Sequence, residues 1–189
     1  MTTGGHHALH IDLRRCTHRS HRLRLIGRLS SCRRQTAHTG GRIRDSAWDG
    51  KTIPPDSVCS NFGGKDVSPA LKVSNIPTGA NAIIIQFNDR DYGPLSNNGG
   101  HGTIGYWVSG GGSATLPSVK GFSAEMPAGA FIEARSYGQG AYRSPGYLAP
   151  CSGGRGHAYE AVVKAVYKAK SPNEESRLLA ETTLLLGRF

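Results

Sequence analysis

The stretch Ala82-Ile83-Ile84-Ile85-Gln86-Phe87 decides the fold class of this 189-residue chain. It is short, apolar and rich in β-branched residues, and it lies between the turn-forming pairs Thr78-Gly79 and Asn88-Asp89. Runs of this length with such boundaries are typical of strands that are covered on both faces. We therefore predict a central, fully buried strand over residues 82–87.

Four other segments have the pattern of strands. Residues 159–167 alternate with a period of two, which places the odd-numbered residues on the face that meets the core. Residues 104–108 form a second apolar run that ends at Ser109 and three glycines, and residues 130–134 form a weaker one. Residues 182–186 are predicted to be a closing strand.

Signals for helix are scarce. Ser171-Pro172-Asn173-Glu174 combines an N-cap serine, a proline at the first helical position and a capping-box glutamate, so a helix of about two turns is predicted to begin there. Short strands separated by glycine and proline, with little helix, favour a mainly β, sandwich-like domain. No internal repeat is visible.

The positive charge of the chain is confined to its first 44 residues. The whole chain has a formal net charge of +10, but residues 1–44 contain ten arginines and one acidic residue, which leaves only +1 for residues 45–189. A leader of this composition cannot bury enough apolar area to fold, so residues 1–44 are predicted to be disordered and residues 45–189 to form one domain. The charge therefore gives no reason to predict specific nucleic-acid binding by the domain.

The leader has two interpretations. Arginine-rich, serine-rich and acid-poor segments resemble organelle transit peptides. The interpretation we favour is translation from a start codon upstream of the true one in a GC-rich frame. The longest apolar run of the leader is too short for a secretory signal, and no run in the chain is long enough to span a membrane.

The histidines indicate where a site could lie. Six of the eight precede residue 40, and the other two, His101 and His157, each lie among glycines at a loop-to-strand junction. Asp89 and Asp91 follow the predicted buried strand, where a strand gives way to a loop. Taken singly, these residues could be an Asx turn, a solvated loop histidine and a strand-edge histidine. Taken together, they predict one pocket built from distant segments.

The residue types in this set suit an oxyanion. His157 and Tyr159 are two residues apart and so share a face of a strand, and Asp89 could orient one imidazole and fix its tautomer. We predict that both imidazoles donate hydrogen bonds to a phosphate or carboxylate group. The same residues could instead bind a divalent metal, as in a metal-dependent hydrolase. Acyl hydrolysis with Cys151 or Ser152 as nucleophile has no supporting motif.

The four cysteines divide into two in the leader and two in the domain. Their spacing does not match a zinc site. Cys59 and Cys151 could form a long-range disulfide or remain buried thiols, and the spacing leaves both open.

Several motifs in order along residues 46–189 resemble the phosphatidylethanolamine-binding protein family, and in particular its bacterial, Raf-kinase-inhibitor-like branch (YbhB/YbcL type). The motifs are Trp48-Asp49-Gly50-Lys51-Thr52-Ile53-Pro54, Val67-Ser68-Pro69-Ala70-Leu71, Asn75-Ile76-Pro77-Thr78-Gly79, Asp89-Arg90-Asp91-Tyr92-Gly93-Pro94, His101, Gly146-Tyr147-Leu148-Ala149-Pro150-Cys151, His157-Ala158-Tyr159, Leu178-Leu179-Ala180-Glu181 and Gly187-Arg188-Phe189.

The resemblance implies a β-sandwich of antiparallel sheets with a few short helices, and a pocket for small anions such as phosphate head groups. Transferred residue by residue, that pocket comprises Asp89, His101, Pro150, His157 and Tyr159, with Asp91 adjacent. The resemblance further implies a binding protein without catalytic activity, cofactor or metal, which could act as a kinase-inhibitor-like modulator of a kinase or protease. A protein-contact inhibitor with a vestigial pocket is the alternative within the same family.

The chain departs from the family pattern around the pocket. The family's aromatic residue before the pocket histidine is Gly100 here, and Gly102 follows it. Arg90 and Tyr92 replace two prolines of the acidic motif, and Ala158 replaces an arginine. The loss of the flanking aromatic residue predicts weaker apolar walls around a ligand.

Overall fold

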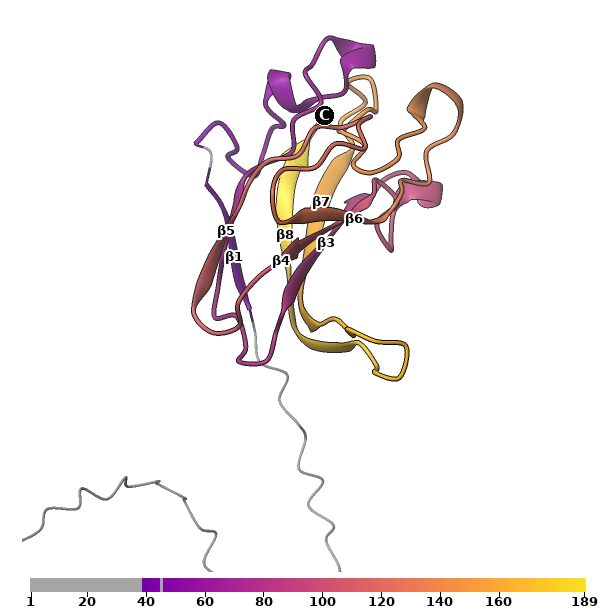
Figure 1. Cartoon of the computed structure of the whole chain (residues 1–189). Coiled ribbons are helices and arrows are strands. Elements are labelled where there is room, and N and C mark those ends of the chain that lie inside the picture. The colour runs from indigo at the N-terminus through magenta and orange to yellow at the C-terminus, as the bar shows by residue number, and fades with distance from the viewer. Residues whose placement is uncertain (1–38, 45) are drawn as a thin grey trace, which may run out of the picture. The chain divides into compact units, whose positions relative to one another are not determined.

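The computed structural model describes residues 39–44 and 46–189, which form two stacked antiparallel sheets (Figure 1). The smaller sheet has the order β1-β2-β5, and the larger has the order β6-β4-β3-β7-β8. This arrangement confirms the predicted mainly β sandwich. The strands are β1 (Gly40–Ile43), β2 (Leu71–Ser74), β3 (Ala82–Asp89), β4 (Thr103–Trp107), β5 (Ser113–Leu116), β6 (Ala130–Ala134), β7 (Ala158–Tyr167) and β8 (Arg177–Arg188).

Four 3-10 turns interrupt the loops, and no α-helix occurs in the described residues. They are η1 (Pro55–Ser57), η2 (Ser60–Phe62), η3 (Gly93–Leu95) and η4 (Gly140–Tyr142). No helix in the described part of the chain could cross a membrane.

The strand predicted over residues 82–87 is the centre of the larger sheet, as β3. β3 pairs with β4 on one side and with β7 on the other, and Ile83, Ile85 and Phe87 are buried in the core. The odd-numbered residues of β7 from 159 to 165 are buried as well, as the alternation predicted. Leu71 and Leu116 of the smaller sheet belong to the same hydrophobic cluster, so the core lies between the two sheets.

The prediction of a helix at Ser171 is wrong. Residues 168–176 form the connection between β7 and β8, whose register pairs Tyr167 with Arg177. The Glu174 carboxylate accepts hydrogen bonds from the Lys170 N–H at 3.0 Å and from the Tyr167 hydroxyl at 2.8 Å. The predicted capping glutamate therefore closes a hairpin, because the long β-ladder on either side determines where the chain must turn back.

The predicted boundary of the folded part at residue 45 also needs correction. β1 lies inside the segment that was expected to be disordered, and it pairs with all four residues of β2. Gly41 lies against Leu184 of β8, where an added Cβ would come within 3.2 Å of the leucine side chain. The folded part thus begins before residue 45, and the remainder of the leader falls outside the described residues.

We expect β1 to contribute measurably to stability. The free energy of unfolding of a variant that lacks residues 1–44 should be about 2–4 kcal/mol lower than that of a variant that lacks only residues 1–38. The longer deletion removes the four-residue ladder with β2 and the contact with β8. Urea unfolding of the two truncated proteins measures the difference. Equal stability of the two would show that β1 is not an integral strand.

Candidate functional site

The candidate site forms where β3 ends and β7 begins. The register of this antiparallel pair places Asp89 opposite Tyr159. Just beyond the ladder, the Arg90 N–H donates to the Ala158 carbonyl at 2.8 Å, and the Ala158 N–H donates to the Asp91 carboxylate at 2.8 Å. These bonds fix the acidic loop beside the segment that carries the second histidine of the domain.

Asp89 orients His157. Oδ2 of the buried Asp89 lies 2.7 Å from Nδ1 of His157, and Oδ1 accepts the Asp91 N–H at 3.0 Å. A carboxylate can only accept, so Nδ1 of His157 carries the proton of this hydrogen bond. The ring nitrogen that remains for a ligand is therefore Nε2.

The loop that carries His101 is held by the end of β3. The His101 N–H donates to the Phe87 carbonyl at 2.8 Å, and the Asn88 side-chain oxygen accepts the N–H groups of Gly99 and Gly100 at 2.9 and 3.3 Å. These bonds bring the histidine back beside the strand that supplies Asp89.

Close backbone contacts require glycine on both sides of His101. A Cβ at Gly100 would lie 2.3–2.5 Å from backbone atoms of Leu95, and one at Gly102 would lie 2.2 Å from the Gly146 carbonyl oxygen. Gly102 also has a φ of 99°, which disfavours any residue with a side chain. No aromatic side chain can therefore stand immediately before the pocket histidine in this loop.

The ring of His101 is buried and has one fixed hydrogen bond. Nδ1 lies 2.9 Å from the Leu148 carbonyl oxygen, so Nδ1 is again the donor, and the Leu148 N–H donates back to the His101 carbonyl at 2.8 Å. The residue is only 2% exposed, and Nε2 has no hydrogen-bond partner among the described residues. Burial lowers the pKa of His101 below its ordinary value, opposed by the Leu148 hydrogen bond and the Asp89 charge, so the neutral ring is favoured.

A cavity of about 270 Å³ lies beside these residues. This volume is slightly below the range of about 300–1,000 Å³ that is usual for small-molecule sites, and it suits a head group better than a whole lipid. The wall combines the two imidazoles and Asp89 with aromatic and apolar side chains. It is formed by Asp89, Tyr92, Pro94, Leu95, His101, Tyr137, Gly138, Gln139, Tyr142, Leu148, Cys151, Ser152, Arg155 and His157.

Three of the six predicted site residues, Asp89, His101 and His157, meet at this cavity. The other three lie behind or beside its wall. Tyr159 is 2% exposed, its ring packs edge-on against His101 at 5.3 Å, and its hydroxyl oxygen accepts the Cys151 N–H at 3.2 Å. The Pro150 carbonyl accepts the Cys59 N–H at 2.9 Å, and Asp91 is occupied by the Ala158 N–H.

Sequence reasoning missed the aromatic part of the wall. Exposed Tyr92, Tyr137 and Tyr142 border the cavity together with exposed Arg155. The available signal was the pair Tyr137 and Tyr142 in the glycine-containing segment just before the Gly146 motif. These tyrosines add aromatic surface to the wall, and the expectation of weaker apolar walls stays a prediction.

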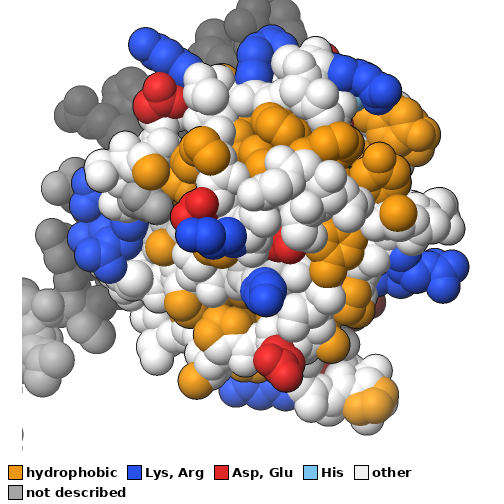
Figure 2. Space-filling model, turned by 90° about the horizontal axis from the view of Figure 1, so that it is seen from above, with side chains coloured by type: hydrophobic (Ala, Val, Ile, Leu, Met, Phe, Trp, Pro, Cys, Tyr) orange, Lys and Arg blue, Asp and Glu red, His pale blue; other side chains and the backbone are white. Residues whose placement is uncertain are grey.

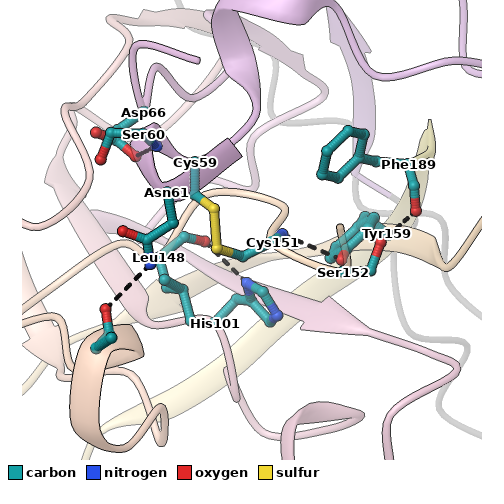
Figure 3. The surroundings of a disulfide bond; sticks show 11 residues. Cys59, Ser60, Asn61, Asp66, His101, Leu148, Cys151, Ser152, Tyr159 and Phe189 are labelled. Atoms are coloured by element: carbon teal, nitrogen blue, oxygen red, sulfur yellow. Dashed lines mark hydrogen bonds between the residues drawn. A yellow bond between two sulfur atoms is a disulfide. The ribbon is translucent and has the colours of Figure 1, made fainter. Parts of the chain in front are cut away.

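A disulfide joins Cys59, just before η2, to Cys151 in the cavity wall (Figure 3). It connects residues 92 positions apart in the sequence. Next to it, the Asn61 side chain donates to the Ala141 carbonyl at 3.2 Å, and the Ser152 hydroxyl donates to Phe189. The disulfide thus anchors the wall to the N-terminal part of the domain.

Metal chemistry finds no support in the geometry. Within residues 39–44 and 46–189, no three side chains of His, Cys, Asp or Glu converge as a metal-ligand set. Asp89 and His157 are bonded to each other, and Nδ1 of His101 is committed to a carbonyl oxygen. The hydrolase alternative is accordingly not favoured.

Comparison with known proteins identifies the family. The sequence model of the phosphatidylethanolamine-binding protein family matches residues 44–184, so the chain belongs to this family. Membership supports a ligand-binding protein of this type.

A solved structure agrees on the fold. A crystal structure of Escherichia coli YbcL, described as a new member of the mammalian PEBP family, superposes with a TM-score of 0.52 at 21% identity, covering 80% of this chain and 99% of the other. A phosphatidylethanolamine-binding protein homologue from Chlamydia trachomatis superposes with a TM-score of 0.47 at 19% identity, covering 80% and 97%. No curated protein matches the chain.

Removal of the disulfide should destabilise the domain. Replacing both Cys59 and Cys151 by serine frees a long loop in the unfolded chain, and we expect the free energy of unfolding to fall by about 4 kcal/mol. Urea unfolding with and without a reducing agent measures it. The reducing agent should lower the stability of the wild type and leave the double variant unchanged; a wild type indifferent to reduction would contradict the role assigned to this bond.

The buried neutral His101 predicts a pH dependence of stability. Because its folded pKa lies below the unfolded value, the unfolded chain binds the proton more readily, and stability is present above about pH 6.5 and lost as the pH falls. The contribution of His101 changes the free energy of unfolding by at most about 1.4 kcal/mol per pH unit. His101→Asn, which can keep a donor near the Leu148 carbonyl, should be closer in stability to the wild type at pH 5.5 than at pH 7.5. If urea unfolding gives the same difference in free energy between the wild type and His101→Asn at both pH values, the prediction is wrong.

Proposed function

We propose that the domain binds a small anion of the phosphate head-group type in the cavity between Asp89, His101 and His157. The observation that carries the proposal is the convergence of two imidazoles at one cavity, one of them oriented by a buried carboxylate at 2.7 Å. Imidazoles held in this way are pre-organised, so a ligand does not have to order them.

The charge around the cavity supports an anionic ligand. Arg155 is exposed in the wall and makes no salt bridge with any residue in the described part of the chain. The Asp89 carboxylate is occupied by the His157 ring and the Asp91 N–H, which reduces its repulsion of an anion. Seen from above, hydrophobic patches and separate Lys, Arg, Asp and Glu side chains are scattered among uncharged polar side chains and backbone (Figure 2).

The proposal describes binding without catalysis. None of the wall residues has the nucleophile–base arrangement of a hydrolase: Ser152 donates to Phe189, and Cys151 is in the disulfide. Membership of the bacterial, Raf-kinase-inhibitor-like branch and modulation of a kinase or protease are the parts of this proposal that rest on sequence motifs.

Calorimetric titration with inorganic phosphate and with phosphoethanolamine tests the site. We expect both to bind the wild type, and His157→Ala to bind about 10–100-fold more weakly, because a hydrogen bond to a charged group contributes about 1.5–3 kcal/mol. Arg155→Ala should also weaken binding, through loss of a cation in the wall.

Arg90→Ala is the matched control. Arg90 is an exposed arginine of the neighbouring loop that pairs with Glu160 at 3.5 Å and does not line the cavity. Its loss should leave the affinity unchanged. Equal heats for the wild type and His157→Ala would refute the site, and absence of binding by the wild type would favour an inhibitor that acts through protein contact alone.

A further inference from the structure

The hydrogen-bond donors of both pocket histidines are already in use. Nδ1 of His101 donates to the Leu148 carbonyl at 2.9 Å, and Nδ1 of His157 donates to Asp89 at 2.7 Å. In a neutral imidazole only one nitrogen carries hydrogen, so Nε2 of each ring is a lone pair. A ligand that contacts either ring in its neutral form therefore meets an acceptor, whereas the sequence analysis predicted that both rings donate.

An acceptor nitrogen and an oxyanion oxygen cannot form a hydrogen bond unless one of them carries a proton. Two lone pairs repel, and a buried polar group without a partner costs about 1–3 kcal/mol. The conflict disappears when the ligand oxygen carries hydrogen and donates to Nε2. It also disappears when the ring takes a proton from solvent and Nε2 becomes a donor.

We propose that the cavity recognises an oxyanion through a proton shared with an Nε2 atom, and so prefers oxyanions that carry a hydroxyl group near neutral pH over equally shaped ones that do not. The inference rests on the proposed function and adds the chemical class of the ligand. Phosphate, which keeps a hydroxyl, fits this class, and sulfate, with the same tetrahedral shape and no hydroxyl, does not.

The surroundings of His101 favour its neutral state before a ligand arrives. His101 is enclosed by Leu148, Tyr159 and the cavity wall, and burial lowers its pKa. His157 is bonded through its backbone to Phe189 and through its ring to Asp89. The titratable or charged groups around both rings are Asp89, Asp91, Tyr92, Tyr137, Tyr142, Arg155, Tyr159 and Arg188.

None of these groups relieves the conflict. Arg188 donates to the Gly156 carbonyl, pairs with Asp91 at 3.6 Å and does not line the cavity. Arg155 supplies attraction for any anion and does not distinguish phosphate from sulfate. Nε2 of His101 or His157 must therefore distinguish phosphate from sulfate.

The experiment compares phosphate and sulfate at equal charge. At pH 8.5 both ions carry two negative charges, and only phosphate has a hydroxyl. We expect the full-length protein to bind phosphate at least tenfold more tightly than sulfate at pH 8.5, and the affinity for sulfate to rise at pH 5.5, where protons from solution supply the missing donor. Titrations in buffers of different ionisation enthalpy should count one more proton taken up per bound sulfate than per bound phosphate.

Two variants distinguish the effect of the shared proton from the electrostatic attraction of the anion to cationic side chains. In His157→Gln a side-chain amide can donate from the Nε2 position at every pH, so the preference for phosphate at pH 8.5 should be reduced. Arg90→Gln, outside the cavity, should keep the preference of the wild type. Tryptophan fluorescence and far-ultraviolet circular dichroism check that both variants are folded.

The outcomes are distinct. Equal affinity for the two ions at pH 8.5, or equal proton uptake, would overturn the inference and leave the anion site of the proposed function in place. Binding of neither ion at any pH would overturn both. Unchanged preference in His157→Gln would assign the shared proton to His101 alone, and His101→Asn, which has no group at the Nε2 position, should then abolish it; if it does not, the inference is wrong.

Discussion

The antiparallel ladder between β3 and β7 is the constraint on which the site depends. Its register pairs eight residues, from Ala82 with Val166 to Asp89 with Tyr159. A shift by one residue would turn every side chain of β7 to the opposite face. The buried face of β7 and the covered apolar run of β3 exclude such a shift, because it would expose Ala161 and Val163 and bury Lys164. Core packing thereby fixes the distance between Asp89 and His157.

The same ladder explains why much of the fold could be predicted. The strands with the clearest patterns, at 82–87 and 159–167, are the centre of the larger sheet, where burial on one or both faces leaves a periodic trace in the sequence. β1, β2 and β5 have four residues each and were not predicted as strands. Their pairing is decided by partners far away in the chain, and segments of this length carry too little periodicity to reveal it.

The site could be predicted in part for a similar reason. Asp89, His101 and His157 were found because histidines are rare in the domain and because all three residues lie at or next to strand ends. The tyrosines of the wall were missed because loops place them, and no short pattern encodes where a loop folds back. The roles of the ring nitrogens were not predictable either, since they depend on which carbonyl or carboxylate lies within hydrogen-bond distance.

The glycines on either side of His101 have a consequence for how this domain tolerates substitution. A methyl group at position 100 would overlap the backbone of Leu95, and one at position 102 would overlap the Gly146 carbonyl. Leu95 and residues 146–148 belong to separate segments bordering the histidine. Alanine at either position must therefore displace one of them. In a saturation mutagenesis screen, the tripeptide 100–102 would score as three sensitive positions, although only its middle residue has a side chain to offer a ligand.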